Sequence, residues 1–296
     1  MRNAFYTYHP AINILYFALI IMFTMFFMHP VCLVISLGAA FAYSLYLQGK
    51  RALRFNLLYM LPMLLFTALI NPLFNHQGVT ILGYFRNGNP LTGESIVYGL
   101  AAAVMLVAVI TWFSCVNIIV TTDKMVYLFG RMIPALSLIL SMVLRFVPRF
   151  SAQLRVVAAA QRGLGRDITS GNWWQRVRHG AAILSVMITW SLESAVETAD
   201  SMKSRGYGLG GRTAFSLFRF DQRDAKVLAF MLALSAYILW GAGGGELSFH
   251  YFPMLSAIAP GGYSFSLWLS YLALGLMPLL IDLLEDSRWK RMQLNI

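Results

Sequence analysis

Six long apolar stretches are the feature that most constrains how this chain of 296 residues can fold. They are Ala11–Met28, Pro30–Leu47, Leu57–Phe74, Ser95–Val120, Ala225–Gly243 and Phe265–Leu284. A helix of about 20 apolar residues crosses the hydrocarbon core of a bilayer with its backbone groups hydrogen-bonded inside the segment. The sequence therefore predicts an all-α, polytopic membrane protein with about six spans and the lipid bilayer as its surroundings.

The composition supports this class and excludes several others. Hydrophobic residues make up 58% of the chain and charged residues only 12%, whereas soluble domains have about 25% charged residues. Both cysteines, Cys32 and Cys115, lie inside apolar stretches, so neither a disulfide framework nor a cysteine-ligated metal site is expected. Only Arg2 precedes the first stretch and no small-residue cleavage site follows it, so we expect a retained span.

Basic residues indicate the orientation of the spans. Of the 23 Lys and Arg residues, Arg86 alone falls in a loop on the opposite side from the other 22. Because basic flanking segments stay in the cytoplasm, both termini and the long middle region are predicted to be cytoplasmic. This gives three parts: spans 1–4 in 1–120, a cytoplasmic region in 121–224, and spans 5–6 with a C-terminal tail in 225–296. The net charge of +11 is thereby a topology signal, and no motif typical of nucleic-acid binding accompanies it.

The middle region is too polar to span a membrane and too periodic to be disordered. Three helices are predicted in it, over Pro134–Phe146, Pro148–Arg162 and Trp173–Arg205. The first is about half the length of a span and ends in a charge, so we expect it to lie at the membrane interface.

The second and third of these predicted helices end alike, at Gln161-Arg162-Gly163 and at Ser204-Arg205-Gly206. Glycine closes a helix in the left-handed conformation, and the helix dipole favours a C-terminal arginine by ~0.3–1 kcal/mol, which explains either end taken alone. Two such ends on amphipathic cytoplasmic helices favour another interpretation. A guanidinium at a helix tip can insert into a groove of a soluble partner and bind a carboxylate through two hydrogen bonds.

These tripeptides, together with Leu144-Arg145-Phe146-Val147-Pro148 and residues 199–208, resemble the T component of energy-coupling-factor transporters, a family of cobalt, nickel and vitamin uptake permeases. The resemblance covers nearly the whole chain. It implies a subunit in the plasma membrane of a prokaryote that links two cytoplasmic ABC ATPases to a small membrane protein that binds a vitamin or a metal ion.

The same resemblance implies roles for particular residues. The ATPase-coupling residues would be Arg162, Gly163, Arg205 and Gly206, with supporting contacts from Gln161, Ser204, Arg145 and Pro148. The chain itself would be non-catalytic and would bind no cofactor, because the partner ATPases hold ATP and Mg. The family's usual Ala-Arg-Gly is Gln-Arg-Gly and Ser-Arg-Gly here, and its N-terminal Asp-Pro is replaced by His9-Pro10. Whether the module is shared among substrate binders or dedicated to one stays open.

Two further patterns concern the third predicted helix of the middle region. Small residues would allow it to cross the second helix closely: Ser191, Ser194, Ala195, Thr198 and Ala199. An acidic strip of Glu193, Glu197 and Asp200 could face arginines such as Arg155. A solvated acidic face with weak pairs is the open alternative.

Other kinds of function find little support in the residues. No G-x-x-x-x-G-K-[ST] loop occurs, so the chain is not expected to bind ATP in the P-loop manner. The outer histidines His29, His76 and His250 are scattered, with no pair at i and i+4, so no metal site is expected.

The spans are essentially free of Asp, Glu, Lys and Arg until Asp282 at the end of the last one, which disfavours a proton- or sodium-coupled carrier. The runner-up function is a substrate-lining permease subunit of a conventional binding-protein-dependent ABC importer, for which one coupling helix would suffice. An intramembrane enzyme would need clustered acids, histidines or a nucleophile at one depth, and the sequence shows none.

Overall fold

The computed structural model describes residues 4–84, 88–167, 169, 171–209, 218–257 and 261–294. The chain divides into two compact units. The membrane unit comprises Met1–Met125 and Phe218–Ile296, and the unit between them, Val126–Leu217, is called the arm.

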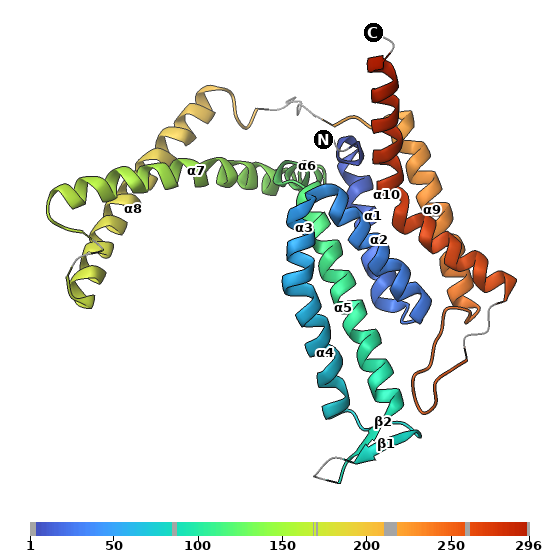
Figure 1. Ribbon diagram of the computed structural model, residues 1–296. Helices are drawn as coiled ribbons and strands as arrows, with labels where there is room; N and C mark the ends of the chain where they lie inside the picture. Colours follow the sequence, from blue (N-terminus) through green and yellow to red (C-terminus); the bar gives the residue numbers. More distant parts are fainter. Residues whose placement is uncertain are drawn as a thin grey trace. The chain divides into compact units, whose positions relative to one another are not determined.

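The membrane unit is built of helices, and the structure confirms an all-α polytopic membrane protein. Its helices are α1 Pro10–Phe26, α2 Pro30–Gln48, α3 Lys50–Phe55, α4 Leu61–Phe74, α5 Gly93–Ile119, α9 Gln222–Gly243 and α10 Gly262–Leu294. Five stretches in the described residues are long and apolar enough to cross a membrane: Pro30–Gln48, Lys50–Phe74, Gly93–Ile119, Gln222–Gly243 and Gly262–Ser287. The first predicted span is the shorter apolar helix α1. Figure 1 shows α5 beside both α4 and α2, which agrees with their contacts.

The third span begins earlier than the hydropathy predicts. Helix α3 starts at Lys50, continues through a π-helical turn over Asn56–Met60 and runs on as α4. The predicted start at Leu57 is wrong because the basic residues Lys50, Arg51 and Arg54 interrupt the apolar run without interrupting the backbone. Basic side chains can be accommodated at a helix end where they reach the membrane surface.

The long loop between α4 and α5 contains a two-stranded antiparallel ribbon that the sequence did not predict. Strands β1, Ile81–Tyr84, and β2, Pro90–Thr92, pair with Ile81 opposite Thr92. The Glu94 carboxylate at the start of α5 accepts hydrogen bonds from the Thr80 amide at 3.1 Å and from its hydroxyl at 2.7 Å. These hydrogen bonds thus connect the ribbon to the N-terminal end of α5.

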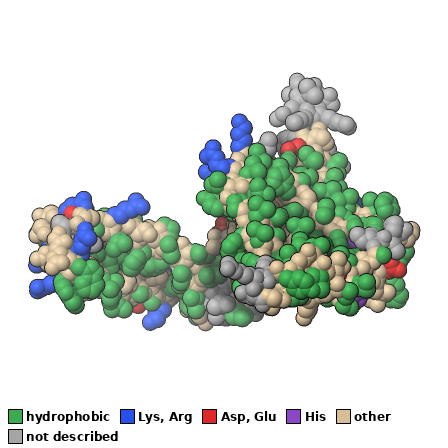
Figure 2. Space-filling model, turned by 60° about the horizontal axis from the view of Figure 1, so that its bottom comes forward, with side chains coloured by type: hydrophobic (Ala, Val, Ile, Leu, Met, Phe, Trp, Pro, Cys, Tyr) green, Lys and Arg blue, Asp and Glu red, His purple; other side chains and the backbone are tan. Residues whose placement is uncertain are grey.

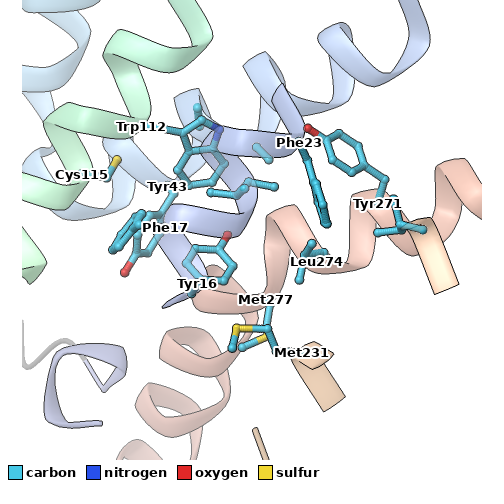
Figure 3. Packing of buried hydrophobic residues seen from close by; sticks show 14 of the residues in the cluster. Tyr16, Phe17, Phe23, Tyr43, Trp112, Cys115, Met231, Tyr271, Leu274 and Met277 are labelled. Carbon is cyan, nitrogen blue, oxygen red and sulfur yellow. The ribbon is translucent and has the colours of Figure 1, made fainter. Parts of the chain in front are cut away.

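The core of the membrane unit is aromatic. Tyr16 and Phe17 of α1 meet Trp112 of α5 edge to face, with ring centroids 6.2 Å and 6.3 Å from Trp112 (Figure 3). The Trp112 indole donates to Ser36 Oγ at 3.1 Å, and Ser36 shares a 2.6 Å hydrogen bond with Thr24. These polar groups come from three helices and satisfy one another, as buried groups in an apolar medium must.

The arm consists of long helices that pack on each other. The chain enters it along α6, Thr122–Met132, which is followed by α7, Pro134–Gly163, and α8, Trp173–Ser204. Val157 of α7 and Ile183 and Met187 of α8 form a small buried cluster with Phe150 and Trp190 packed against it. Figure 1 shows α7 and α8 crossing, with their C-terminal ends apart.

Helix α7 corrects one prediction. The sequence favoured an interfacial helix over Pro134–Phe146 and a separate helix from Pro148 to Arg162, whereas the structure has one helix of 30 residues with Pro148 inside it. Proline lacks the N–H that would reach the Leu144 carbonyl, but the hydrogen bonds on either side keep the helix continuous. The proline thus marks a weak point in α7 rather than its start.

Candidate functional site

The first Arg-Gly motif forms the C-terminal end of α7. The Gly165 amide donates to the Arg162 carbonyl at 3.0 Å, and the Arg166 amide donates to the Gln161 carbonyl at 2.9 Å. Gly165, with φ of +77°, is the left-handed residue that closes the helix, while Gly163 is its last helical residue. The sequence predicted that the helix ends at Gly163 and Gly165, and of these two glycines it is Gly165 that supplies the left-handed conformation.

The Arg162 side chain holds a carboxylate within its own loop. Its Nε donates to Asp167 Oδ2 at 3.0 Å and its Nη2 to Asp167 Oδ1 at 3.4 Å. The guanidinium side chain is 65% exposed and that of Asp167 25% exposed. Both carboxylate oxygens also accept from Thr169, from its amide at 3.0 Å and from its hydroxyl at 2.7 Å. Arg162 is thereby presented at the surface in a two-point ion pair.

These contacts lower the pKa of Asp167 to about 2, mainly through the two Thr169 hydrogen bonds and secondarily through Arg162. A lowered pKa means that the carboxylate contacts are fully present above the ordinary aspartate pKa and are lost as the pH falls through about 2. In a carboxyl-carbon NMR titration, we expect a midpoint near 2 that moves upward in Thr169→Val. A wild-type midpoint near the ordinary value of about 4 would contradict the loop geometry.

The second Arg-Gly motif closes α8 in a similar way. Ser204 is the last helical residue and Arg205 is the C-cap, followed by Gly206 with φ of +79°. The Tyr207 amide donates to the Met202 carbonyl at 3.0 Å. Here the predicted glycine does supply the left-handed closure. Arg205 is exposed and forms no ion pair with any residue that the structure describes.

The predicted supporting residues do not gather in one place. Gln161 and Ser204 each precede an arginine at a helix end, and Ser204 Oγ donates to the Asp200 carbonyl at 3.0 Å. Arg145 and Pro148 are exposed in the middle of α7, more than three helical turns before its end. The site is accordingly two separate helix ends on one packed pair of helices.

The α8 face that packs is only partly the predicted one. Ser194 is buried, Ser191 and Thr198 are half-buried, and Ala195 and Ala199 are exposed. In the described chain, none of the three residues Glu193, Glu197 and Asp200 forms an ion pair with Arg155. The two helices are held by the apolar cluster instead, and the acidic strip is a solvated face.

A basic recess that the sequence did not predict lies beside the Arg162 end. It has a volume of about 530 Å³ and is lined by Gly165, Arg166, Gly171, Gln175, Arg178, His179 and Ala182. Two guanidinium groups and an imidazole line it without a carboxylate, which gives the α7 end a positive surface. Figure 2 shows Lys and Arg side chains gathered on the arm. Within the described residues, no group of three His, Cys, Asp or Glu side chains could hold a metal ion.

Comparison with known proteins assigns this chain to a family. The family model "Cobalt transport protein" (CbiQ) matches residues 6–216, a range that contains both Arg-Gly ends. The chain belongs to this family. The resemblance seen in the sequence is thus confirmed.

Among the family's relatives are proteins named energy-coupling factor transporter transmembrane protein EcfT. The one from Bacillus selenitireducens is 30% identical over 155 residues, which are 49% of this chain and 58% of that protein. The one from Bacillus subtilis is 27% identical over 187 residues, covering 60% of this chain and 70% of that protein. The chain therefore spans less than two thirds of the length of the Bacillus selenitireducens protein.

Proposed function

We propose that this chain is the transmembrane coupling (T) subunit of an energy-coupling-factor importer for a vitamin or a metal ion. It transmits ATP-driven motion from two cytoplasmic ATPases to a small substrate-binding membrane subunit. The observation that carries the proposal is the pair of exposed arginines, Arg162 and Arg205, at the ends of two helices packed into one arm. The family match over both ends and the names of the relatives support it.

In this mechanism the two arginines are mechanical contacts. ATP binding brings the ATPases together, and the helix ends seated in their grooves move with them. Because α7 and α8 are joined by the cluster around Val157, Ile183 and Met187, displacement of one end is passed to the other helix. The ion pair between Arg162 and Asp167 illustrates the two-point geometry that an acidic group of an ATPase would offer.

The chemistry of ATP belongs to the partners in this proposal. The chain has no P-loop sequence, and its proposed role requires neither a catalytic residue nor a cofactor of its own. ATP and Mg are held by the ATPases. The vitamin or metal ion is substrate, bound by the small membrane subunit.

The proposed orientation places both termini and the arm in the cytoplasm of a prokaryotic cell, in the plasma membrane. The basic residues that support it include Lys50 and Arg54 in α3, Lys124 in α6 and Lys226 in α9. The runner-up, a permease subunit that lines the substrate path, is not favoured, because the relatives are named as transmembrane proteins of energy-coupling factor transporters.

Co-purification tests the proposal directly. A tagged chain extracted in mild detergent should retain two ATPase subunits and one small membrane protein per copy, counted by native mass spectrometry. A complex of two copies of this chain with an extracellular binding protein would instead identify the conventional permease.

A further inference from the structure

The chain leaves the membrane unit for the arm after Met125 and returns to it at Phe218, and both joints contact one short segment at the N-terminus. This segment, Ala4–His9, is called the strap. It contains the 3-10 turn Phe5–Thr7, and four of its six residues are buried: Ala4, Phe5, Tyr8 and His9. A strap buried between two chain joints can fix the position of both.

The outgoing joint is fixed by Lys124 in the first turn of α6, which is only 1% exposed. Its ammonium donates to the Tyr6 carbonyl of the strap at 2.6 Å and to the Ile119 carbonyl of α5 at 3.0 Å. The Asn13 amide, turned so that its oxygen faces Lys124, accepts at 2.7 Å and donates to the Phe5 carbonyl at 3.1 Å. The Tyr6 ring lies 3.9 Å from the same ammonium.

Three neutral oxygens therefore satisfy the three donors of this buried lysine. No carboxylate of the described residues pairs with it. The Ile119 carbonyl belongs to the last turn of α5, where the helix dipole favours a cation. Burying an ammonium in this way is costly unless all its donors are used, so the position of the first turn of α6 depends on the strap being in place.

The returning joint is fixed by Arg223 in the first turn of α9. Its Nη2 donates to Thr7 Oγ1 of the strap at 3.2 Å, and its guanidinium carbon lies 4.3 Å from the centre of the Tyr8 ring. Its Nη1 forms an ion pair with Glu285 of α10 at 3.1 Å. Just before α9, the Phe220 ring meets His9 edge to face with centroids 5.6 Å apart.

The strap is in turn fastened to the last helix. The Phe5 amide donates to Asp282 Oδ1 at 2.7 Å, and Asp282 is 1% exposed. Helix α10 thus holds the strap through Asp282 and the returning joint through Glu285. Asp282, the charged residue at the end of the last span, thus accepts a hydrogen bond from a residue near the N-terminus.

We propose that the strap is the fixed anchor of the arm, with Lys124 and Arg223 as positioning residues for coupling. Motion imposed on α7 and α8 is transmitted to the membrane unit only if the two joints stay in place under load. The strap contacts both joints and connects them to α1, α5 and α10. This inference rests on the proposed function for the motion itself. The anchoring contacts stand on the geometry of the membrane unit alone.

The test compares Lys124→Met combined with Arg223→Met against Lys226→Met combined with Arg155→Met in the full complex in liposomes. Each pair removes two cations, but Lys226 and Arg155 are exposed and form no ion pair within the described chain. In the strap pair, we expect normal assembly and ATP hydrolysis but at least tenfold less substrate imported per ATP. The control pair should match the wild type. Wild-type import per ATP in the strap pair would overturn the proposal.

Hydrogen exchange of the wild-type complex tests whether the strap is a fixed anchor, and it needs no variant whose folding would have to be checked. Amides in the strap, especially that of Phe5, should stay equally protected with an ATP analogue and with ADP bound to the ATPases. A tenfold or greater difference in strap exchange between the two states would show that the strap moves and is no anchor. If the chain bound no ATPase at all, the proposed function would fail, whereas slow strap exchange in the isolated chain would still report the anchoring contacts.

Discussion

Arg162→Ala combined with Arg205→Ala is expected to abolish import while the chain still inserts into the membrane. A charge-assisted hydrogen bond to a carboxylate contributes about 1.5–3 kcal/mol, so losing both tips should weaken ATPase binding by at least about a hundredfold. Both side chains are exposed helix ends outside the packed cluster, so folding should be unaffected. Uptake by cells and the amount of ATPase retained on the purified chain measure the effect.

A matched control removes the same charges from the same helices. Arg155→Ala with Lys203→Ala changes exposed residues of α7 and α8 that form no ion pair within the described chain, and should leave import unchanged. The single variants should be milder than the double. Arg205→Ala should reduce import more than Arg162→Ala does, because Arg162 has to break its ion pair with Asp167 before it can bind an ATPase. Normal uptake by the double variant at normal complex levels would refute the coupling role.

Gly99→Ala is expected to destabilise the membrane unit by about 1–3 kcal/mol, the usual cost of overpacking. Helix α5 meets α4 at this glycine, where an added Cβ would lie 2.9 Å from the Ala68 carbonyl oxygen and 2.9 Å from Asn71 Cβ. A backbone carbonyl cannot turn aside as a flexible side chain can. The two helices would have to separate, which should lower the apparent Tm in detergent.

Gly38→Ala in α2 is the matched control. A Cβ there meets no atom within 4 Å, and alanine is the better helix former by about 1 kcal/mol. The same chemical change should therefore leave the Tm unchanged or raise it. Equal behaviour of the two variants would show that the close approach of α4 and α5 is absent.

The spans could be predicted from the sequence because the bilayer leaves a helix few alternatives. An uninterrupted apolar run such as 95–120 must satisfy its own backbone, and α5, Gly93–Ile119, follows it within two residues. The end of α8 was also predictable, since Arg205 and Gly206 carry an ordinary helix-termination signal.

The predictions that failed concern residues whose local sequence is compatible with two different structures. Pro148 after a short amphipathic stretch reads as a helix start, but also as a helix interior, and only packing along α7 decides between them. Gly163 and Gly165 are equally good closing residues by type. In the structure, Gly165 is the residue with the left-handed backbone conformation that closes the helix.

The anchoring contacts could not be predicted from the sequence at all. Asp282 stood out as the only charge in the last span, but its partner, the Phe5 amide, lies 277 residues away in the chain. Lys124 looked like any basic residue next to a span. Its burial depends on three neutral oxygens that only the folded structure brings together.

The continuity of α7 has a mechanical consequence. A helix of 30 residues is about 45 Å long, so in the proposed function it would act as a lever between its Gly163 end and its Pro134 end. The missing hydrogen bond at Pro148 makes one place, near the middle, softer in bending than the rest. Any flexing of the lever under load should concentrate at that single elbow, leaving the half that bears Arg162 to turn as a rigid piece.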